Sequence, residues 1–221
     1  MENFTERLVD RTVSSKADDL NATTVEAAKI DIADTIVCGL LGARAPGIPQ
    51  LIDWVRSLNS SGKSAVWSHG LNVPPSLAAL CNASMAHALD FDDTHDEAVL
   101  LAGVGAIPAA LAVAQQKGGV GGAELIRATV WGVETISLLG LATPEGPSQS
   151  GWMLTSLYSY FGSVIAAGCI LELDRRQLTD ALGIAYSMSA GNSVCANAGA
   201  LTKRMQPGFG NQSGVMAVEL A

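Results

Sequence analysis

The densest group of chemically active side chains lies in the segment HALDFDDTHDE, at residues 87–97. It holds five carboxylates and two imidazoles within eleven residues of an otherwise apolar sequence. Carboxylates this close raise one another's pKa when they are buried, so that one of them can act as an acid or a base near neutral pH. A solvated acidic loop between two helices is the other interpretation, and composition alone does not separate the two.

Asp92 to Asp96 also match the Asp-Asp-x-x-Asp pattern with which all-helical prenyl-transferring and terpene-cyclising enzymes hold magnesium and a diphosphate. On a helix, Asp92 and Asp96 would face the same way and could share an ion. Such enzymes also need a second acidic segment and basic residues for the diphosphate, whereas the second half of this chain offers only scattered carboxylates. We therefore predict neither a metal nor an organic cofactor.

A second polar point is the pair of cations Lys203 and Arg204, in the segment TKRMQPG at 202–208. They precede a predicted helix, whose N-terminal N–H groups and dipole favour an anion, so this position suits a carboxylate. A lysine in a partly desolvated pocket can also lose its proton and act as a base. Two solvated surface cations are the plain alternative.

Helices must position both groups, because the spacing of apolar residues and a composition with only 5% aromatic residues predict an all-α chain. Asp174 is an N-cap candidate, and Gly118 to Gly122 reads as a turn between helices rather than a phosphate loop. The uncharged stretch 98–114 is expected to be a buried core helix. The expected helices cover roughly residues 23–41, 49–58, 75–89, 104–116, 122–141, 150–171, 174–188 and 208–221.

The composition bounds the class of protein. With 221 residues, 48% of them apolar and 15% charged, the chain can build a packed core and is not disordered. Its 13 basic and 21 acidic residues give a net charge of −8, which argues against nucleic acid and membrane partners. No signal-peptide pattern opens the sequence, and its four cysteines form no close pair, so we expect a cytoplasmic protein.

Three blocks of the sequence resemble the MmgE/PrpD family. The first is AHALDFDDTH at 86–95, with AALCNASM before it and IPAALA at 107–112 after it. The others are GWMLTSLYSYFGSVIAAGCILELD at 151–174 and TKRMQPGFGNQSGVMAVELA at 202–221, in the family's order and approximate spacing. The resemblance implies one all-helical MmgE/PrpD-type domain over residues 1–221. Because family members are much longer and the chain breaks off inside an amphipathic helix, we expect it to be truncated before the family's inserted α+β domain.

The family includes 2-methylcitrate dehydratase, cis-aconitate decarboxylase and iminodisuccinate epimerase, which act on small polycarboxylates without an iron–sulfur cluster, usually as homodimers. The resemblance therefore implies a dehydratase-type lyase acting on a small di- or tricarboxylate such as 2-methylcitrate, in a homodimer. An isomerase or epimerase of a small dicarboxylate is one alternative. A non-catalytic, truncated dimerisation remnant is the other.

Carried over by motif, Asp90, Thr94 and Lys203 match positions that line the family's active site. Lys203 would bind a substrate carboxylate or shuttle a proton, Thr94 would donate a hydrogen bond, and Asp90 would act as an acid or base or orient one. His95, surrounded by acidic residues, is the better of two nearby imidazoles to titrate near neutral pH and to pair with Lys203. The remaining candidates, all assigned to substrate binding, are Asp93, Arg204 and Gln206.

The sequence departs from the family where many members carry histidine. Leu101, Met153 and Gln206 occupy those positions, and leucine and methionine side chains cannot move protons. These replacements put the standard dehydratase or decarboxylase mechanism in doubt and favour the alternatives. His87, on the helix that leads into the acidic segment, reads as a hydrogen-bonded structural histidine.

Overall fold

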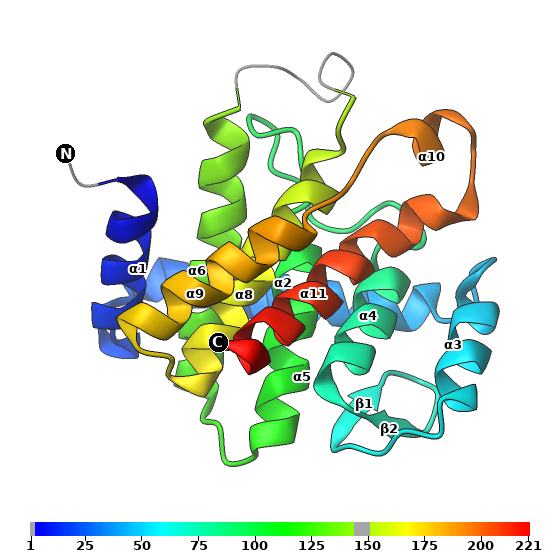
Figure 1. Ribbon diagram of the computed structural model, residues 1–221, viewed down its shortest axis with the longest axis horizontal. Coiled ribbons are helices and arrows are strands. Elements are labelled where there is room, and N and C mark those ends of the chain that lie inside the picture. The colour runs from blue at the N-terminus through cyan, green and yellow to red at the C-terminus, as the bar shows by residue number, and fades with distance from the viewer. Residues whose placement is uncertain (1–2, 144–150) are drawn as a thin grey trace.

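The computed structural model describes residues 3–143 and 151–221, and in that part of the chain helices pack directly on helices (Figure 1). Short 3-10 turns lie at Ala17–Asp19, Gly103–Gly105 and Leu201–Met205, and one antiparallel hairpin joins β1 (Ser64–Val66) to β2 (Leu71–Val73). The predicted helical class is confirmed, with this hairpin as its one departure among the described residues. The helices are α1 (Phe4–Ser14), α2 (Ala22–Gly42), α3 (Ile48–Ser57), α4 (Pro75–Ala86), α5 (Ile107–Lys117), α6 (Gly122–Leu141), α8 (Leu154–Leu171), α9 (Arg175–Met188), α10 (Val194–Asn197) and α11 (Gln206–Leu220).

Local sequence signals set several helix ends as predicted. Asp174 caps α9, where its side chain accepts the Gln177 N–H at 2.9 Å and completes a capping box. The glycine turn is also confirmed, because Gly118 and Gly119 have φ of +73° and +70°, a conformation that favours glycine. For α8, the predicted start at Ser150 lies outside the described residues, and the helix begins at Leu154.

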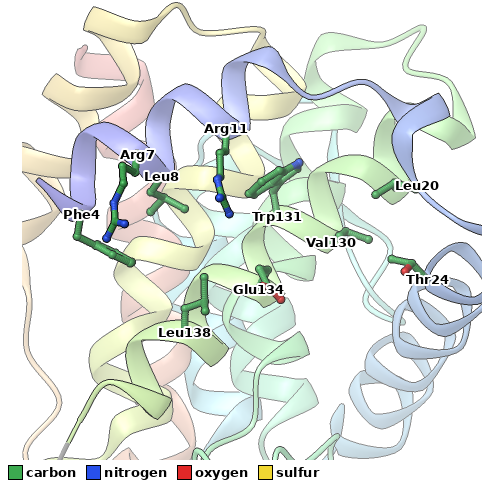
Figure 2. A pocket seen from close by; sticks show the side chains of 10 residues that line it. All are labelled: Phe4, Arg7, Leu8, Arg11, Leu20, Thr24, Val130, Trp131, Glu134 and Leu138. Carbon is green, nitrogen blue, oxygen red and sulfur yellow. The ribbon is translucent and has the colours of Figure 1, made fainter. Parts of the chain in front are cut away.

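The sequence prediction missed helix α1, the β1–β2 hairpin and the four-residue helix α10. In α1, Leu8 and Val9 are buried and the helix packs against α9, although polar residues dominate its sequence. Together with α2 and α6, α1 also borders a hollow of about 470 Å³, into which Arg7 and Arg11 point (Figure 2). The hairpin is anchored by buried Asn82 of α4, which accepts the Trp67 N–H and donates to the Ala65 carbonyl, both at 3.0 Å.

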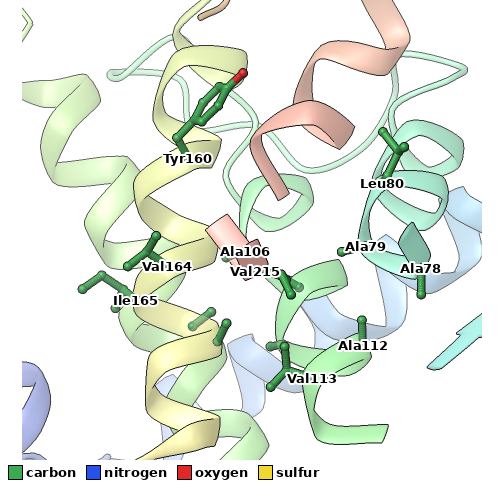
Figure 3. Close-up of a cluster of buried hydrophobic side chains, with 14 of the residues drawn as sticks. Ala78, Ala79, Leu80, Ala106, Ala112, Val113, Tyr160, Val164, Ile165 and Val215 are labelled. Atoms are coloured by element: carbon green, nitrogen blue, oxygen red, sulfur yellow. The ribbon is translucent and has the colours of Figure 1, made fainter. Parts of the chain in front are cut away.

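The core lies around α8, which packs against α6, α9, α5 and α11. Figure 3 shows side chains of α8, including Val164 and Ile165, in one cluster with Val215 of α11. The approach of α11 to α8 is close because α11 presents glycines there: a Cβ on Gly210 would lie 2.5 Å from the Ser159 Cβ. Such contacts between small residues let helix backbones pack without a gap.

Two long apolar stretches of the sequence form different structures. By length and composition α8 could cross a membrane, but 78% of the qualifying stretch is buried inside the protein, as in a core helix. The core helix expected within 98–114 is confirmed only from Ile107 onward, where α5 begins. The preceding residues form a loop and a 3-10 turn, so the prediction was wrong there, because Gly103 and Gly105 interrupt the helix before Pro108 restarts it.

The helix α4 ends at Ala86, three residues before the predicted end at Leu89. Residues 87–102, here called the acidic loop, then run without helix to the 3-10 turn. Asp90 has a φ of +62°, which a continuing right-handed helix does not allow. Asp92 and Asp96 therefore do not share a helix face, and the prenyl-transferase interpretation of this segment is wrong on geometry.

Candidate functional site

Asp93 holds the acidic loop against its own far end. Its carboxylate accepts the backbone N–H groups of Ala102 and Gly103, each at 3.0 Å. Burial raises the pKa of Asp93 and outweighs these two hydrogen bonds, with the charges of Asp92 and Asp34 adding to the rise. The structure thus gives Asp93 a role in shaping the loop, and the substrate-binding role expected for it stays a prediction.

An acidic residue of α2 lies next to Asp93. Burial, followed by the charges of Asp93 and Asp34, raises the pKa of Asp31 to about 7. Its Oδ1 is buried and has no hydrogen-bond partner among the described residues. A Cβ added to Gly103 would overlap this Oδ1 and lie 2.8 Å from an oxygen of Asp93, so the two carboxyl groups meet across that glycine.

In the first turn of the acidic loop, the Asp90 carboxylate forms an ion pair with the Lys203 ammonium. Lys203 lies in the 3-10 turn before α11, 113 residues further along the chain. Desolvation raises the pKa of Asp90, but the hydrogen bond and charge of Lys203, with the charges of His87 and Arg204, lower it below its usual value. Two predicted catalytic residues therefore meet at one place.

Arg204 adds a second cation beside this pair. Its Nη1 donates to the Pro46 carbonyl at 2.7 Å, which fixes the guanidinium against the turn before α3. The charge of Arg204 is among those that lower the pKa of Asp90, so it acts at the same point of the surface. The 3-10 turn that precedes α11 thus places two cations near an acidic side chain, and the anion-binding role expected for them stays a prediction.

Below Asp90 lies a buried imidazole. His87 is only 1% exposed, and its Nδ1 lies 3.0 Å from Oδ2 of Asp92, which is itself 3% exposed. Its Nε2 is 3.8 Å from Oδ1 of Asp90 and is buried without a hydrogen bond among the described residues. The prediction of a hydrogen-bonded His87 is confirmed by the Asp92 contact, whereas the approach of Nε2 to Asp90 was missed.

His87, Asp90 and Asp92 could also be considered as metal ligands, because one ligand atom from each lies within 4.8 Å of the others. All three side chains already have partners within the protein. The Lys203 ammonium pairs with Asp90, and the imidazole of His87 bonds to Asp92. The cluster therefore has partners other than a metal ion, and we build no metal chemistry on it.

The other predicted catalytic residues of the loop lie apart from the ion pair. Thr94 is exposed, and its hydroxyl is 3.5 Å from the Asp92 carbonyl. The Nδ1 of His95 accepts the Ala98 N–H at 3.3 Å, within the turn that the loop makes there. In residues 3–143 and 151–221, no hydrogen bond joins Thr94 or His95 to Asp90 or Lys203, and their catalytic roles stay predictions.

Gln206, the first residue of α11, borders a small cavity next to the ion pair's lysine. Its Nε2 donates to the Asn192 carbonyl at 3.0 Å and lies 3.0 Å from Sγ of Cys195. Its Oε1 is buried and unpartnered among the described residues. The cavity measures about 210 Å³, and Thr202, Asn192 and Tyr160 also line it. Two of its lining residues, Thr202 and Gln206, flank Lys203 in the sequence. None of the predicted site residues lines the larger hollow beside α1.

Comparison with known proteins identifies the family of the chain. The sequence model described as the MmgE/PrpD N-terminal domain matches residues 6–221. The chain belongs to the MmgE/PrpD family. It is 31% identical over 209 residues to cis-aconitate decarboxylase of Aspergillus terreus, covering 92% of this chain and 42% of that protein. It is 28% identical over 226 residues to the cis-aconitate decarboxylase-like protein oryM of Aspergillus oryzae, covering 99% of this chain and 47% of that protein. The chain thus spans less than half the length of these relatives.

The structure locates the three positions where the sequence departs from the histidines expected of MmgE/PrpD proteins. The N–H of Leu101 donates to Oγ1 of Thr155 at 2.9 Å, in the first turn of α8. The N–H of Met153 donates to the Gly191 carbonyl at 2.8 Å, and Gly191 precedes the residue that Gln206 contacts. Leu101 and Met153 therefore lie by the start of α8, and Met153 and Gln206 both bond to the segment 191–192, which lines the cavity.

Proposed function

We propose that this chain carries the carboxylate-binding part of an MmgE/PrpD lyase site, which acts on a small di- or tricarboxylate such as cis-aconitate or 2-methylcitrate. The observation that carries the proposal is the meeting of Lys203 with Asp90 at the N-terminal end of α11. Arg204 beside them adds a second charge of the sign that a polycarboxylate requires. The activity for which the Aspergillus terreus relative is named, cis-aconitate decarboxylation, suggests the type of reaction.

The chemistry assigns a task to each of these groups. Dehydration, decarboxylation and epimerisation of such acids pass through carbanion or enolate character next to a carboxylate, so a cation must face the developing charge. Lys203 would bind the substrate carboxylate and stabilise that charge. Asp90, whose pKa is lowered, is ionised at neutral pH and would accept the proton once the substrate takes over Lys203.

An isomerase or epimerase of a small dicarboxylate is the second candidate. It is favoured by Leu101 and Met153, whose side chains cannot carry protons for a dehydratase that depends on histidines at those positions. Epimerisation needs only two groups that exchange a proton with one carbon, and Lys203 with Asp90 would supply them. A non-catalytic remnant, which the length of the chain relative to its relatives favours, would bind carboxylates without turning them over.

Turnover in D₂O separates these candidates. The purified chain is incubated with cis-aconitate, 2-methylcitrate and iminodisuccinate, and NMR and mass spectrometry follow loss of CO₂ or water and uptake of deuterium. A lyase predicts loss of CO₂ or water that stops in Lys203→Ala and continues in Lys29→Ala, a control whose lysine forms an exposed pair with Glu26. Deuterium uptake without loss would assign the isomerase instead. If the chain binds these acids but shows neither loss of CO₂ or water nor deuterium uptake, the catalytic proposal is overturned.

A further inference from the structure

In the free protein, one ring nitrogen of His87, Nε2, has no hydrogen-bond partner among the described residues. A carboxylate oxygen accepts hydrogen bonds, so in the 3.0 Å contact with Asp92 the Nδ1–H of His87 is the donor. In the neutral imidazole, Nε2 is then a bare acceptor. It is buried without a hydrogen bond among the described residues, and the Asp90 carboxylate oxygen that approaches it is 3.8 Å away. Buried acceptors of this kind are uncommon in folded proteins.

We infer that His87 is the positioning residue that receives the Asp90 carboxyl group when a carboxylate ligand occupies Lys203. This inference rests on the proposed function. A ligand carboxylate and Asp90 compete for one ammonium group, so binding of the ligand releases Asp90 from its ion pair. The released side chain needs a partner, and Nε2 of His87 is the unsatisfied atom that faces it.

A proton completes that contact. A carboxylate and a bare imidazole nitrogen are both acceptors, so they can bond only when one proton lies between them, on Oδ of Asp90 or on Nε2 of His87. When Asp90 has taken a proton from the substrate, it donates to Nε2, and the Asp92 carboxylate stabilises any positive charge on the ring. The other charged groups at this point are Lys203 and Arg204 above Asp90, with Asp93 beside Asp92.

The fold makes Asp90 the moving member and His87 the fixed one. The Asp90 side chain is 60% exposed and sits on a residue with φ of +62°, in the first turn of the acidic loop after α4. His87 and Asp92 are 1% and 3% exposed and are bonded to each other. A distance of 3.8 Å must shorten by only about 1 Å to become a hydrogen bond, which a rotation of the exposed side chain supplies.

Histidine nitrogen NMR tests this directly, because the chain has only three histidines and His69 and His95 serve as internal references. In the free protein, we expect His87 as the Nδ1–H tautomer with an unprotonated Nε2. Saturation with citrate should shift the Nε2 resonance toward the hydrogen-bonded or protonated form. Lys203→Ala, without ligand, should produce the same shift, since it frees Asp90 and the Asp90–His87 pair then takes up one proton from solvent, as it does in the citrate complex. An Nε2 resonance unchanged in both experiments would overturn the inference.

A variant separates positioning from folding. His87→Asn keeps a side-chain N–H for Asp92 and removes only the acceptor that faces Asp90. We expect it to weaken citrate binding by about tenfold, the scale of one hydrogen bond, because Asp90 then stays on Lys203. His69→Asn, in the β1–β2 turn, is the matched control and should bind normally.

If citrate binds through Lys203 and the His87 signal does not move, the proposed function stands and the positioning role fails. If Lys203→Ala shifts the His87 signal but citrate never binds, the positioning role stands and the proposed function fails.

Discussion

The carboxylate of Asp90 and the ammonium of Lys203 form an ion pair across 113 residues of sequence, joining the first turn of the acidic loop to the start of α11. Neither residue is buried: their side chains are 60% and 25% exposed. Exposed ion pairs contribute little to stability, so packing gives no strong reason for this contact. A weak pair between an acid and a cation is instead easy to open, as a carboxylate-binding site requires.

The competition between Asp90 and a ligand predicts an unusual variant. Asp90→Asn removes the charge that occupies Lys203, so we expect citrate to bind several-fold more tightly to this variant than to the unchanged chain. Turnover should fall in the same protein, because an amide cannot accept the substrate proton. Calorimetry measures the affinity, and Asp96→Asn, on an exposed residue of the same loop, is the control. Weaker binding in Asp90→Asn would show that Asp90 contacts the ligand rather than competing with it.

Asp31 predicts how stability changes with pH. Its pKa is about 7 in the folded protein, and it returns to an ordinary value near 4 on unfolding. The folded state therefore holds the extra proton between these values, and its free energy of unfolding falls as pH rises from about 4 to about 7. Asp31→Asn removes this contribution, so its stability relative to the unchanged chain should increase across that window. Urea unfolding at several pH values measures it, and parallel pH profiles would contradict it.

The close contact of α11 with α8 predicts a marked difference between two glycine substitutions. In Gly214→Ala, the new methyl group would overlap Oγ of Ser163 and lie 3.0 Å from the Val164 nitrogen, so the helices must separate. We expect a loss of about 1–3 kcal/mol in the free energy of unfolding. Gly183→Ala, in α9, meets nothing within 4 Å and should stabilise by about 0.5–1 kcal/mol. Thermal and denaturant unfolding measure both changes. Changes of the same sign in the two variants would contradict this account of the α8–α11 contact.

The buried amide of Asn211 predicts a larger loss than its size suggests. Its Oδ1 accepts the Ala109 N–H at 3.1 Å, and its Nδ2 donates to the carbonyls of Val104 and Pro207, both at 2.9 Å. Asn211→Leu would leave the buried Ala109 N–H and Val104 carbonyl without this side-chain partner, at a cost of roughly 1–3 kcal/mol each. We expect the variant to unfold at room temperature or to lose most of its stability, as far-ultraviolet circular dichroism would report. Near-normal stability would contradict this assignment.

The fold was predictable where one helix carries its own signals. The apolar spacing of α6 and the N-cap at Asp174 depend only on neighbouring residues, and both matched the structure. The helix α1 and the hairpin were missed, because Leu8 and Val9 are defined by contact with α9, and three-residue strands are too short to show alternation. Long-range packing, rather than local preference, decides those elements.

The site was predictable where sequence motifs identified its residues, but not where long-range packing placed them. The family motifs pointed to Asp90 and Lys203, and their long-range contact followed. The position of His87 could not be read from spacing alone, because it depends on α4 ending at Ala86 and on the left-handed turn at Asp90. A histidine five residues before an aspartate was the one signal available for the His87–Asp92 pair. Nothing in the sequence placed Asp31 of α2 beside Asp93.

Calorimetric titration of the purified chain with citrate, alongside Lys203→Ala and Lys29→Ala, tests the central claim most directly. A carboxylate site on Lys203 predicts that citrate binds the unchanged chain and Lys29→Ala with the same affinity, and that binding disappears in Lys203→Ala while its thermal unfolding midpoint stays close to normal. Equal binding by all three proteins, or by none of them, would contradict the assignment of Lys203 as the carboxylate-binding residue.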